Sequence, residues 1–182
     1  MPGYGYIVLA VGWAVWVLPF FLAQRKKQSA RVVDHRARWG MFIQGVAYAL
    51  LWQGKFWLTR PAGWRFVTGI LFLVLASMLS WSGARALGRQ WRMDAGLNAD
   101  HQLVRSGPYR FVRHPIYASM FCILLGTGFL ITPKWLLVSA IVVFVAGTEI
   151  RVRVEERLLA PHFGGQFLDF KRTVAAYIPF VR

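Results

Sequence analysis

Long apolar stretches separated by short polar segments dominate the chain. Five of them approach the length that crosses the roughly 30 Å hydrocarbon core of a bilayer as a helix. We expect these helices at residues 4–23, 40–58, 64–84, 115–131 and 135–147. The last helical pattern continues towards Leu159, and Pro161 and Gly164-Gly165 are expected to break it. The pattern predicts an all-α fold, a polytopic membrane bundle of five transmembrane helices in a single membrane domain.

The polar segments between these stretches carry an uneven share of positive charge, which sets the expected orientation. Eighteen Lys and Arg fall after the first, third and fifth stretches, whereas the alternate segments carry Arg60, Arg65 and Lys134. Cytoplasmic loops of membrane proteins are rich in Lys and Arg. We therefore expect the N-terminus outside, the C-terminus in the cytoplasm, and a multi-pass protein of the cell (inner) membrane if the source is prokaryotic.

Composition narrows the function classes. The chain has 182 residues, 57% of them hydrophobic, and a formal net charge of +15. The basic residues lie between apolar stretches rather than on one soluble face, which argues against nucleic acid as a partner. A single cysteine and four scattered histidines leave no pattern for a metal site. Membrane lipids are the expected surroundings, and the oligomeric state is not legible.

The polar segment that precedes the fourth stretch, residues 101–117, gathers histidines, arginines and tyrosines at the membrane surface. For Arg105 and Arg110, an ordinary role as positive-inside residues is as good an interpretation as a functional one. His114-Pro115 is different, because proline suits the first turn of a helix and places His114 near the N-cap. Backbone donors beside Arg113 and His114 would favour an anion.

The exit of the fifth stretch carries three of the seven acidic residues of the chain, Glu149, Glu155 and Glu156. Arg151 and Glu155 are four residues apart and share a helix face. Surface ion pairs at this spacing are common, but an ionisable cluster at the membrane boundary suggests a functional site. The tight hairpin at Pro133 makes the last two stretches antiparallel, so we expect both clusters to meet in one pocket.

The pattern His-x-Leu-Val-x-x-Gly-Pro-Tyr-x-x-x-Arg-His-Pro-x-Tyr at residues 101–117, followed by a membrane hairpin, Glu-Glu, Phe-Gly and a closing Ile-Pro-Phe, resembles the isoprenylcysteine carboxyl methyltransferase family. It is similar to the shorter prokaryotic members. The resemblance covers about half of the chain, from Leu87 onwards. It implies an integral membrane methyltransferase that uses S-adenosylmethionine and releases S-adenosylhomocysteine. Residues 85–182 would then form the cofactor-binding half, with a helical hairpin and a cytoplasmic tail, and residues 1–84 the three N-terminal spans.

The resemblance also implies roles for individual residues. By matching position, the cofactor-binding residues are His101, Gln102, Leu103, Val104, Tyr109, His114, Pro115, Ile116, Tyr117 and Glu155. Arg151 matches an arginine assigned to the acceptor carboxylate, so Arg151 and Glu155 are the expected catalytic residues. From their chemistry alone, Arg113 and His114 suit the cofactor carboxylate, and Glu155 or Glu156 suits its positive charges.

The acceptor stays open at this point. A lipophilic carboxylate is already ionised and needs no general base, whereas an amine, phenol or thiol would need one, and His114 or Glu156 would be tested first. Gly126-Thr127-Gly128 is similar to a glycine element of related phospholipid methyltransferases, although close helix packing explains it equally well. A membrane reductase that uses NADPH on a sterol-like substrate is the alternative function, and a non-enzymatic membrane protein is the third.

Overall fold

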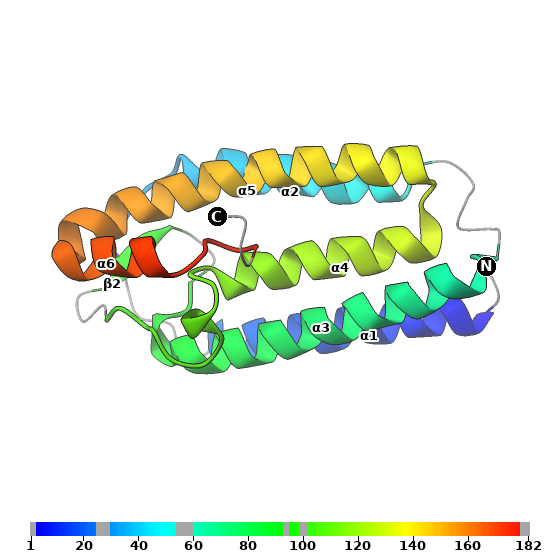
Figure 1. The fold of residues 1–182 in the computed structure, drawn as a ribbon, viewed down its shortest axis with the longest axis horizontal. Coiled ribbons are helices and arrows are strands. Elements are labelled where there is room, and N and C mark those ends of the chain that lie inside the picture. Colours follow the sequence, from blue (N-terminus) through cyan, green and yellow to red (C-terminus); the bar gives the residue numbers. More distant parts are fainter. Residues whose placement is uncertain (1–2, 25–29, 54–59, 93–94, 99–101, 179–182) are drawn as a thin grey trace.

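The computed structural model describes residues 3–24, 30–53, 60–92, 95–98 and 102–178. Its elements in chain order are α1 (Gly3–Gln24), β1 (Ala30–Val33), α2 (Ala37–Leu51), α3 (Gly63–Leu87), η2 (Gly88–Gln90), β2 (Gly96–Asn98), η3 (Gly107–Arg110), α4 (Pro115–Ile131), α5 (Lys134–Phe163) and α6 (Gly165–Thr173). The long helices lie side by side along one axis (Figure 1). The all-α prediction is confirmed, apart from one small sheet.

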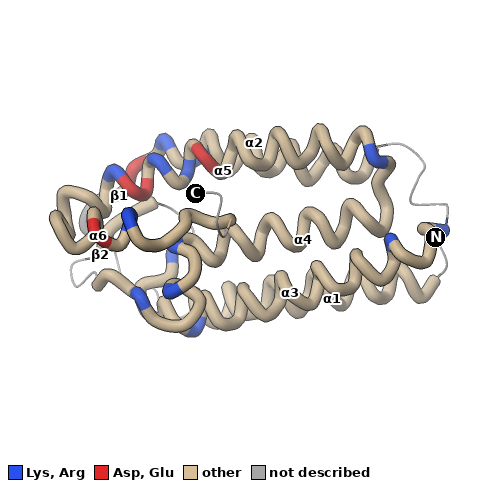
Figure 2. Tube along the Cα trace, in the orientation of Figure 1, with Lys and Arg blue, Asp and Glu red and all other residues tan. Residues whose placement is uncertain are grey.

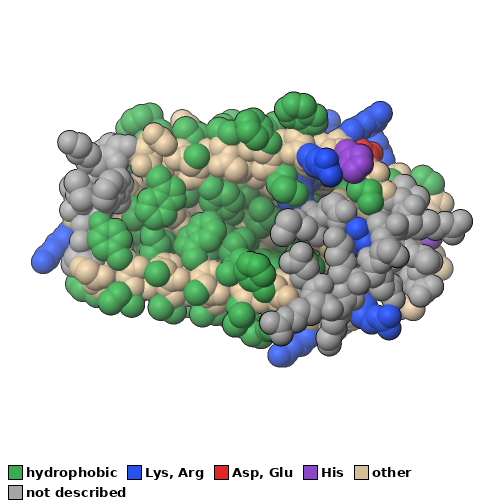
Figure 3. Space-filling model, turned by 180° about the vertical axis from the view of Figure 1, so that it is seen from behind, with side chains coloured by type: hydrophobic (Ala, Val, Ile, Leu, Met, Phe, Trp, Pro, Cys, Tyr) green, Lys and Arg blue, Asp and Glu red, His purple; other side chains and the backbone are tan. Residues whose placement is uncertain are grey.

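The bundle is built around α4. The pair α2 and α5 lies on one side of it, and the pair α1 and α3 lies on the other (Figure 1). Side chains on most sides of α4 are buried, including Ile123, Leu124 and Thr127, whereas α1 and α3 expose large apolar residues such as Ile7 and Leu71. On the face that Figure 3 shows, most of the side chains between the two ends of the bundle are hydrophobic. A surface of this kind suits lipid rather than water.

Within the part of the chain that the structure describes, three helices are long and apolar enough to cross a membrane: residues 3–23, 63–90 and 134–163. The chain is therefore membrane-integral. The shorter helix α4 has 17 residues, and α2 has 15 described residues. The expected second span reaches residue 58, and its last part, residues 54–58, lies outside the described residues.

The helix α5 has 30 residues, so it is about 45 Å long and exceeds the hydrocarbon core by roughly ten residues. The expected continuation past Gly147 is confirmed. The expected break at Pro161 is wrong, because α5 includes Pro161 and ends at Phe163. Proline removes one backbone hydrogen bond, but the Gly164 N–H still reaches the Ala160 carbonyl, and Gly164 (φ 53°) then ends the helix.

Charged residues gather at the end of the bundle where α6 lies, and few lie at the opposite end (Figure 2). At this end β1 and β2 form a two-stranded antiparallel sheet that the sequence pattern does not predict. The C-terminal segment is tied to the start of α4, since the N–H groups of Arg113 and His114 donate to the carbonyls of Ala175 and Ala176 at 2.8 Å each. The chain therefore folds its polar segments together at one end.

The glycines of α4 serve helix packing. A Cβ at Gly126 would lie 2.9 Å from Leu73 of α3, and one at Gly128 would lie 2.3 Å from Leu137 of α5. Thr127 between them accepts a hydrogen bond of 3.0 Å from the Trp13 indole of α1. These contacts favour close helix packing over a cofactor role for the glycine element.

Candidate active site

The start of α4 is the first wall of the site. Pro115 occupies the first turn and His114 is the N-cap, as the sequence predicts. The His114 and Tyr117 rings stack at 5.6 Å between centroids. Both side chains are buried, so this helix end presents an imidazole and a phenol side by side.

The exit of α5 is the second wall. The Tyr117 hydroxyl donates a hydrogen bond to Glu155, whose Oε2 lies 3.3 Å from His114 Nδ1. The Arg151 guanidinium carbon lies 4.8 Å from the centre of the Tyr117 ring, a cation–π contact. The spacing of four residues puts Arg151 and Glu155 on the same face of α5, so both meet α4 at this point. The expected meeting of the two clusters is therefore observed.

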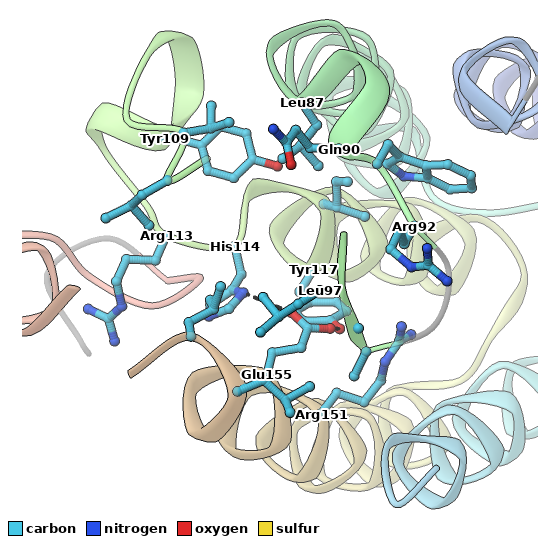
Figure 4. A pocket seen from close by; sticks show the side chains of 18 of the residues that line it. Leu87, Gln90, Arg92, Leu97, Tyr109, Arg113, His114, Tyr117, Arg151 and Glu155 are labelled. Carbon is cyan, nitrogen blue, oxygen red and sulfur yellow. Dashed lines mark hydrogen bonds and ion pairs between the residues drawn. The ribbon is translucent and has the colours of Figure 1, made fainter. Parts of the chain in front are cut away.

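A cavity of about 370 Å³ opens at this junction. Its polar side is formed by His114, Tyr117, Arg151 and Glu155, and Figure 4 shows these side chains close together with Tyr109 and Gln90 on the facing wall. The remaining walls come from α1, α2, the residues around η2 and β2, the last turns of α5, and α6. They include Trp16, Val17, Phe20, Phe21, Met41, Leu87, Trp91, Arg92, Leu97, Leu158, Phe167 and Phe170. The cavity thus joins a charged end to a largely apolar end.

A second ionic cluster lies behind His114. Glu156 accepts from Arg113 Nη2 at 2.8 Å and from Lys171 Nζ of α6 at 2.5 Å. Arg113 also donates to the carbonyls of Lys171 and Val174. Its side chain points away from the cavity centre in Figure 4. This cluster fastens α6 and the C-terminal segment to the start of α4.

Electrostatics set the protonation of the groups on the α4 side. Burial alone would lower the pKa of His114, but hydrogen bonds and negative charge from Glu155 and Glu156 outweigh it and raise the pKa above its ordinary value. Burial raises the pKa of Tyr109 well above its ordinary value, and the charge of Glu155 adds to this effect. Tyr109 therefore remains a hydrogen-bond donor, and His114 holds its proton more readily than a free imidazole does.

The structure places the predicted site residues as follows. Those that line the cavity are Gln102, Leu103, Val104, Tyr109, Arg113, His114, Ile116, Tyr117, Arg151 and Glu155. Pro115 shapes the helix start, and Glu156 is directed to Arg113 and Lys171. His101 lies outside the described residues. The roles assigned to these residues stay predictions.

Sequence reasoning missed the walls contributed by the N-terminal half. Trp16 donates to Ser119 at 3.2 Å, and Phe20 stacks on Trp91 at 5.6 Å. A signal was present, because Trp13, Trp16 and Phe20 recur at spacings of three and four and so mark one face of a helix. The place of Trp16 and Phe20 beside the site depends on how α1 packs, which spacing alone does not reveal.

The residues present fit S-adenosylmethionine. The cavity volume lies within the range of roughly 300–1,000 Å³ that small-molecule sites occupy. The Glu155 carboxylate lines the cavity and suits a positively charged ligand group. The cofactor carries two such groups, an ammonium and a sulfonium. The buried Trp91 indole N–H, which also lines the cavity, has no hydrogen-bond partner among the described residues. A buried donor of this kind suits a polar ligand atom.

Comparison with known proteins finds similarity to methyltransferases, in agreement with a site that fits S-adenosylmethionine. A family model described as phospholipid methyltransferase matches residues 64–166, more than half of the chain. The chain is 36% identical over 83 residues to protein-S-isoprenylcysteine O-methyltransferase of Saccharomyces cerevisiae, which is 46% of this chain and 35% of the yeast protein. It is 30% identical over 122 residues to the Mus musculus enzyme of that name, covering 65% of this chain and 43% of the mouse protein.

The protein-S-isoprenylcysteine O-methyltransferase of Schizosaccharomyces pombe is 27% identical over 162 residues, 80% of this chain and 68% of the relative. Against the yeast and mouse proteins named above, the chain spans less than half of their length. The family match begins in α3 and ends at the start of α6, so it contains the start of α4 and the exit of α5 but not the cavity residues of α1 and α2. The chain therefore belongs to the phospholipid methyltransferase family, and its similarity to isoprenylcysteine O-methyltransferases confirms the resemblance found in its sequence.

Proposed function

We propose that the protein transfers a methyl group from S-adenosylmethionine to a carboxylate on a lipophilic acceptor. One observation carries this proposal: a single cavity joins the buried cluster of His114, Tyr117, Arg151 and Glu155 to an apolar region lined by Trp16 and other residues of α1. Methyl transfer to a lipid-borne acid needs such a junction, because the cofactor is polar and the acceptor arrives from the membrane.

On this proposal the cofactor lies between the start of α4 and the exit of α5. When bound, it supplies an electrophilic methyl group on a sulfonium, and S-adenosylhomocysteine is the product. The residues that would hold it are Gln102, Leu103, Val104, Tyr109, His114, Ile116, Tyr117 and Glu155, together with Trp91. The Tyr117 hydroxyl fixes the Glu155 carboxylate through its hydrogen bond, so this negative charge is oriented before the cofactor binds.

Arg151 would orient the acceptor carboxylate. It lies on the same wall as Glu155 and lines the cavity, while the aromatic side chains of α1 line its apolar end. A guanidinium binds a carboxylate through paired N–H groups and so sets its direction. The names of the relatives describe an isoprenylcysteine acceptor, which combines an apolar chain with a terminal acid. The same combination suits this cavity.

The protonation pattern favours a carboxylate over an amine, phenol or thiol. An amine, phenol or thiol acceptor needs a general base, and the two candidates for this base are His114 and Glu156. The neighbouring glutamates raise the pKa of His114 despite its burial, so His114 holds a proton more readily than a free imidazole and is less available as a base. Glu156 is occupied by Arg113 and Lys171. A carboxylate acceptor requires neither.

We also propose that all five helices α1 to α5 cross the membrane as one domain, with the N-terminus outside and the C-terminus in the cytoplasm. The support is the gathering of Lys and Arg at the α6 end of the bundle (Figure 2). The site would then open at the cytoplasmic face, in the inner membrane if the source is prokaryotic. Cysteine labelling of residues at either end in sealed vesicles tests this orientation.

The function is tested with methyl-labelled S-adenosylmethionine and a panel of isoprenoid acids, phospholipids and lipophilic amines. The expected product is a base-labile methyl ester of an acid, and no label on the amines. Thermal stabilisation by S-adenosylhomocysteine but not by NADPH separates this function from the reductase alternative. Stabilisation by NADPH alone would overturn the proposal.

A further inference from the structure

The helix α2 carries one fully buried polar side chain, Gln44, and this residue lies outside the region matched by the family model. Its side chain faces α5 rather than lipid. Buried amides in membrane bundles need partners, because neither lipid nor apolar side chains can satisfy them. The partners of Gln44 connect α2 to the proposed acceptor site.

Three hydrogen bonds fix the orientation of the Gln44 amide. The Thr148 hydroxyl donates to the Phe144 carbonyl at 2.9 Å, so its oxygen accepts from Gln44 Nε2 at 2.8 Å. The other end of the amide, Gln44 Oε1, accepts from Arg151 Nη1 at 3.2 Å. The reversed amide would point its NH2 group at the guanidinium, which has donors only. The donors therefore point in one consistent direction, from Arg151 through Gln44 and Thr148 to the Phe144 carbonyl.

Two glycines make this contact possible. A Cβ at Gly40 of α2 would lie 2.5 Å from the Arg151 side chain and 2.5 Å from the Gly147 carbonyl. A Cβ at Gly147 of α5 would lie 2.7 Å from the Gly40 carbonyl. The two backbones are thus in direct contact one turn away from Gln44, and this brings the amide within reach of Arg151.

We infer that Gln44 is a positioning residue that sets the direction of the Arg151 guanidinium for the acceptor carboxylate. The inference rests on the proposed function. The amide holds Arg151 from the α2 side, and the Tyr117 ring lies against its guanidinium at 4.8 Å from the α4 side. A planar group held at one edge and on one face keeps a defined plane. Gln44 thereby gives the N-terminal half of the bundle a part in acceptor binding.

A purely structural Gln44 would support helix packing only, and kinetics separate the two roles. Gln44→Met keeps the size of the side chain and removes both hydrogen bonds. Removing a hydrogen bond to a charged group is expected to lower kcat/KM for the acceptor by about 10- to 100-fold. We expect most of this loss as a raised KM for the acceptor, while the Kd of S-adenosylhomocysteine changes less than about twofold. A structural defect would instead weaken both ligands together.

The control is Gln53→Met, which makes the same substitution at an exposed glutamine just beyond α2 and is expected to behave as the wild type. Thr148→Val is the second variant, and it keeps Gln44 while removing the hydroxyl that holds its amide. We expect a smaller loss of acceptor kcat/KM in the same direction, and less loss in Thr148→Ser, which retains the hydroxyl. These variants keep the test open if Gln44→Met does not fold.

The outcomes are distinct. Wild-type transfer with unchanged acceptor KM in both Gln44→Met and Thr148→Val overturns the inference alone. So does an equal loss of acceptor and S-adenosylhomocysteine binding in every folded variant. A wild-type protein that binds S-adenosylhomocysteine but methylates no acid overturns the proposed acceptor class and the inference with it. A selective rise in acceptor KM, with the cofactor affinity intact, supports the assignment.

Discussion

The substitution Glu156→Gln tests how the C-terminal segment is held on the site. The Glu156 side chain is 6% exposed and accepts from Arg113, whose own side chain is 4% exposed, at 2.8 Å. Lys171 of α6 reaches the other carboxylate oxygen at 2.5 Å. Glutamine preserves the shape of the side chain but removes the negative charge, so Arg113 becomes a buried charge without its counter-ion.

The expected cost follows from burial. Removing one partner of a buried ion pair destabilises a protein by about 3–5 kcal/mol. The Lys171 side chain is 45% exposed, so water screens its ion pair with Glu156, and this pair contributes no more than about 1 kcal/mol to the stability of the fold. Because the amide oxygen can still accept one hydrogen bond, we expect the lower end, about 3 kcal/mol. For a chain of this length this corresponds to a fall of roughly 6–12 °C in the unfolding temperature.

The measurement is thermal unfolding of the purified protein in detergent, without cofactor. Asp169→Asn is the matched control, because Asp169 is an exposed acid on α6 and its loss is expected to change the unfolding temperature by about 2 °C or less. Proteolysis of the tail gives a second readout, since α6 should be cut earlier in Glu156→Gln. A fall no larger than that of Asp169→Asn would refute the idea that this cluster fastens the tail.

Three further predictions concern the site and its helices. Arg151→Ala is expected to reduce transfer to a carboxylate acceptor at least about 100-fold with S-adenosylhomocysteine affinity nearly unchanged, and a matching loss of cofactor affinity would count against the assignment. The raised pKa of His114 means that its stabilising charge is fully present below its ordinary pKa near 6.5 and is lost as the pH rises through the higher folded-state value. The gap in unfolding temperature between the wild type and His114→Gln should therefore shrink from pH 6 to pH 9, and a gap that grows would contradict this sign. Gly147→Val should lower the unfolding temperature by several degrees, because even its Cβ would lie 2.7 Å from the Gly40 carbonyl, whereas Gly45→Val, at a position with open space around it, should not.

The local features of the site could be predicted because their physics is local. Pro115 determines where α4 begins, so the N-cap position of His114 follows from the sequence. The spacing of Arg151 and Glu155 determines their common face, and the hairpin at Pro133 makes α4 and α5 antiparallel. These three facts were sufficient to expect one pocket between the two helices.

Contacts between distant segments could not be predicted in this way. Nothing in the pattern around Ala30–Val33 indicates that this strand pairs with Gly96–Asn98, because the pairing depends on how the helices between them pack. The same holds for Arg113, which reads as an anion ligand but is directed to Glu156 by the C-terminal segment. Gln44 left a signal, since a polar amide within an apolar stretch needs a partner. Its partner, Arg151, is more than a hundred residues away.

The account depends on the start of α4 and the exit of α5 forming one cofactor site. Equilibrium titration with S-adenosylhomocysteine tests this most directly, using the wild type, His114→Ala, Glu155→Gln, and Arg60→Ala at the other end of the bundle as control. We expect one site per chain, at least about tenfold weaker binding in both site variants, and wild-type binding in Arg60→Ala. Binding that is absent in the wild type, or that is insensitive to both site variants, would contradict the account.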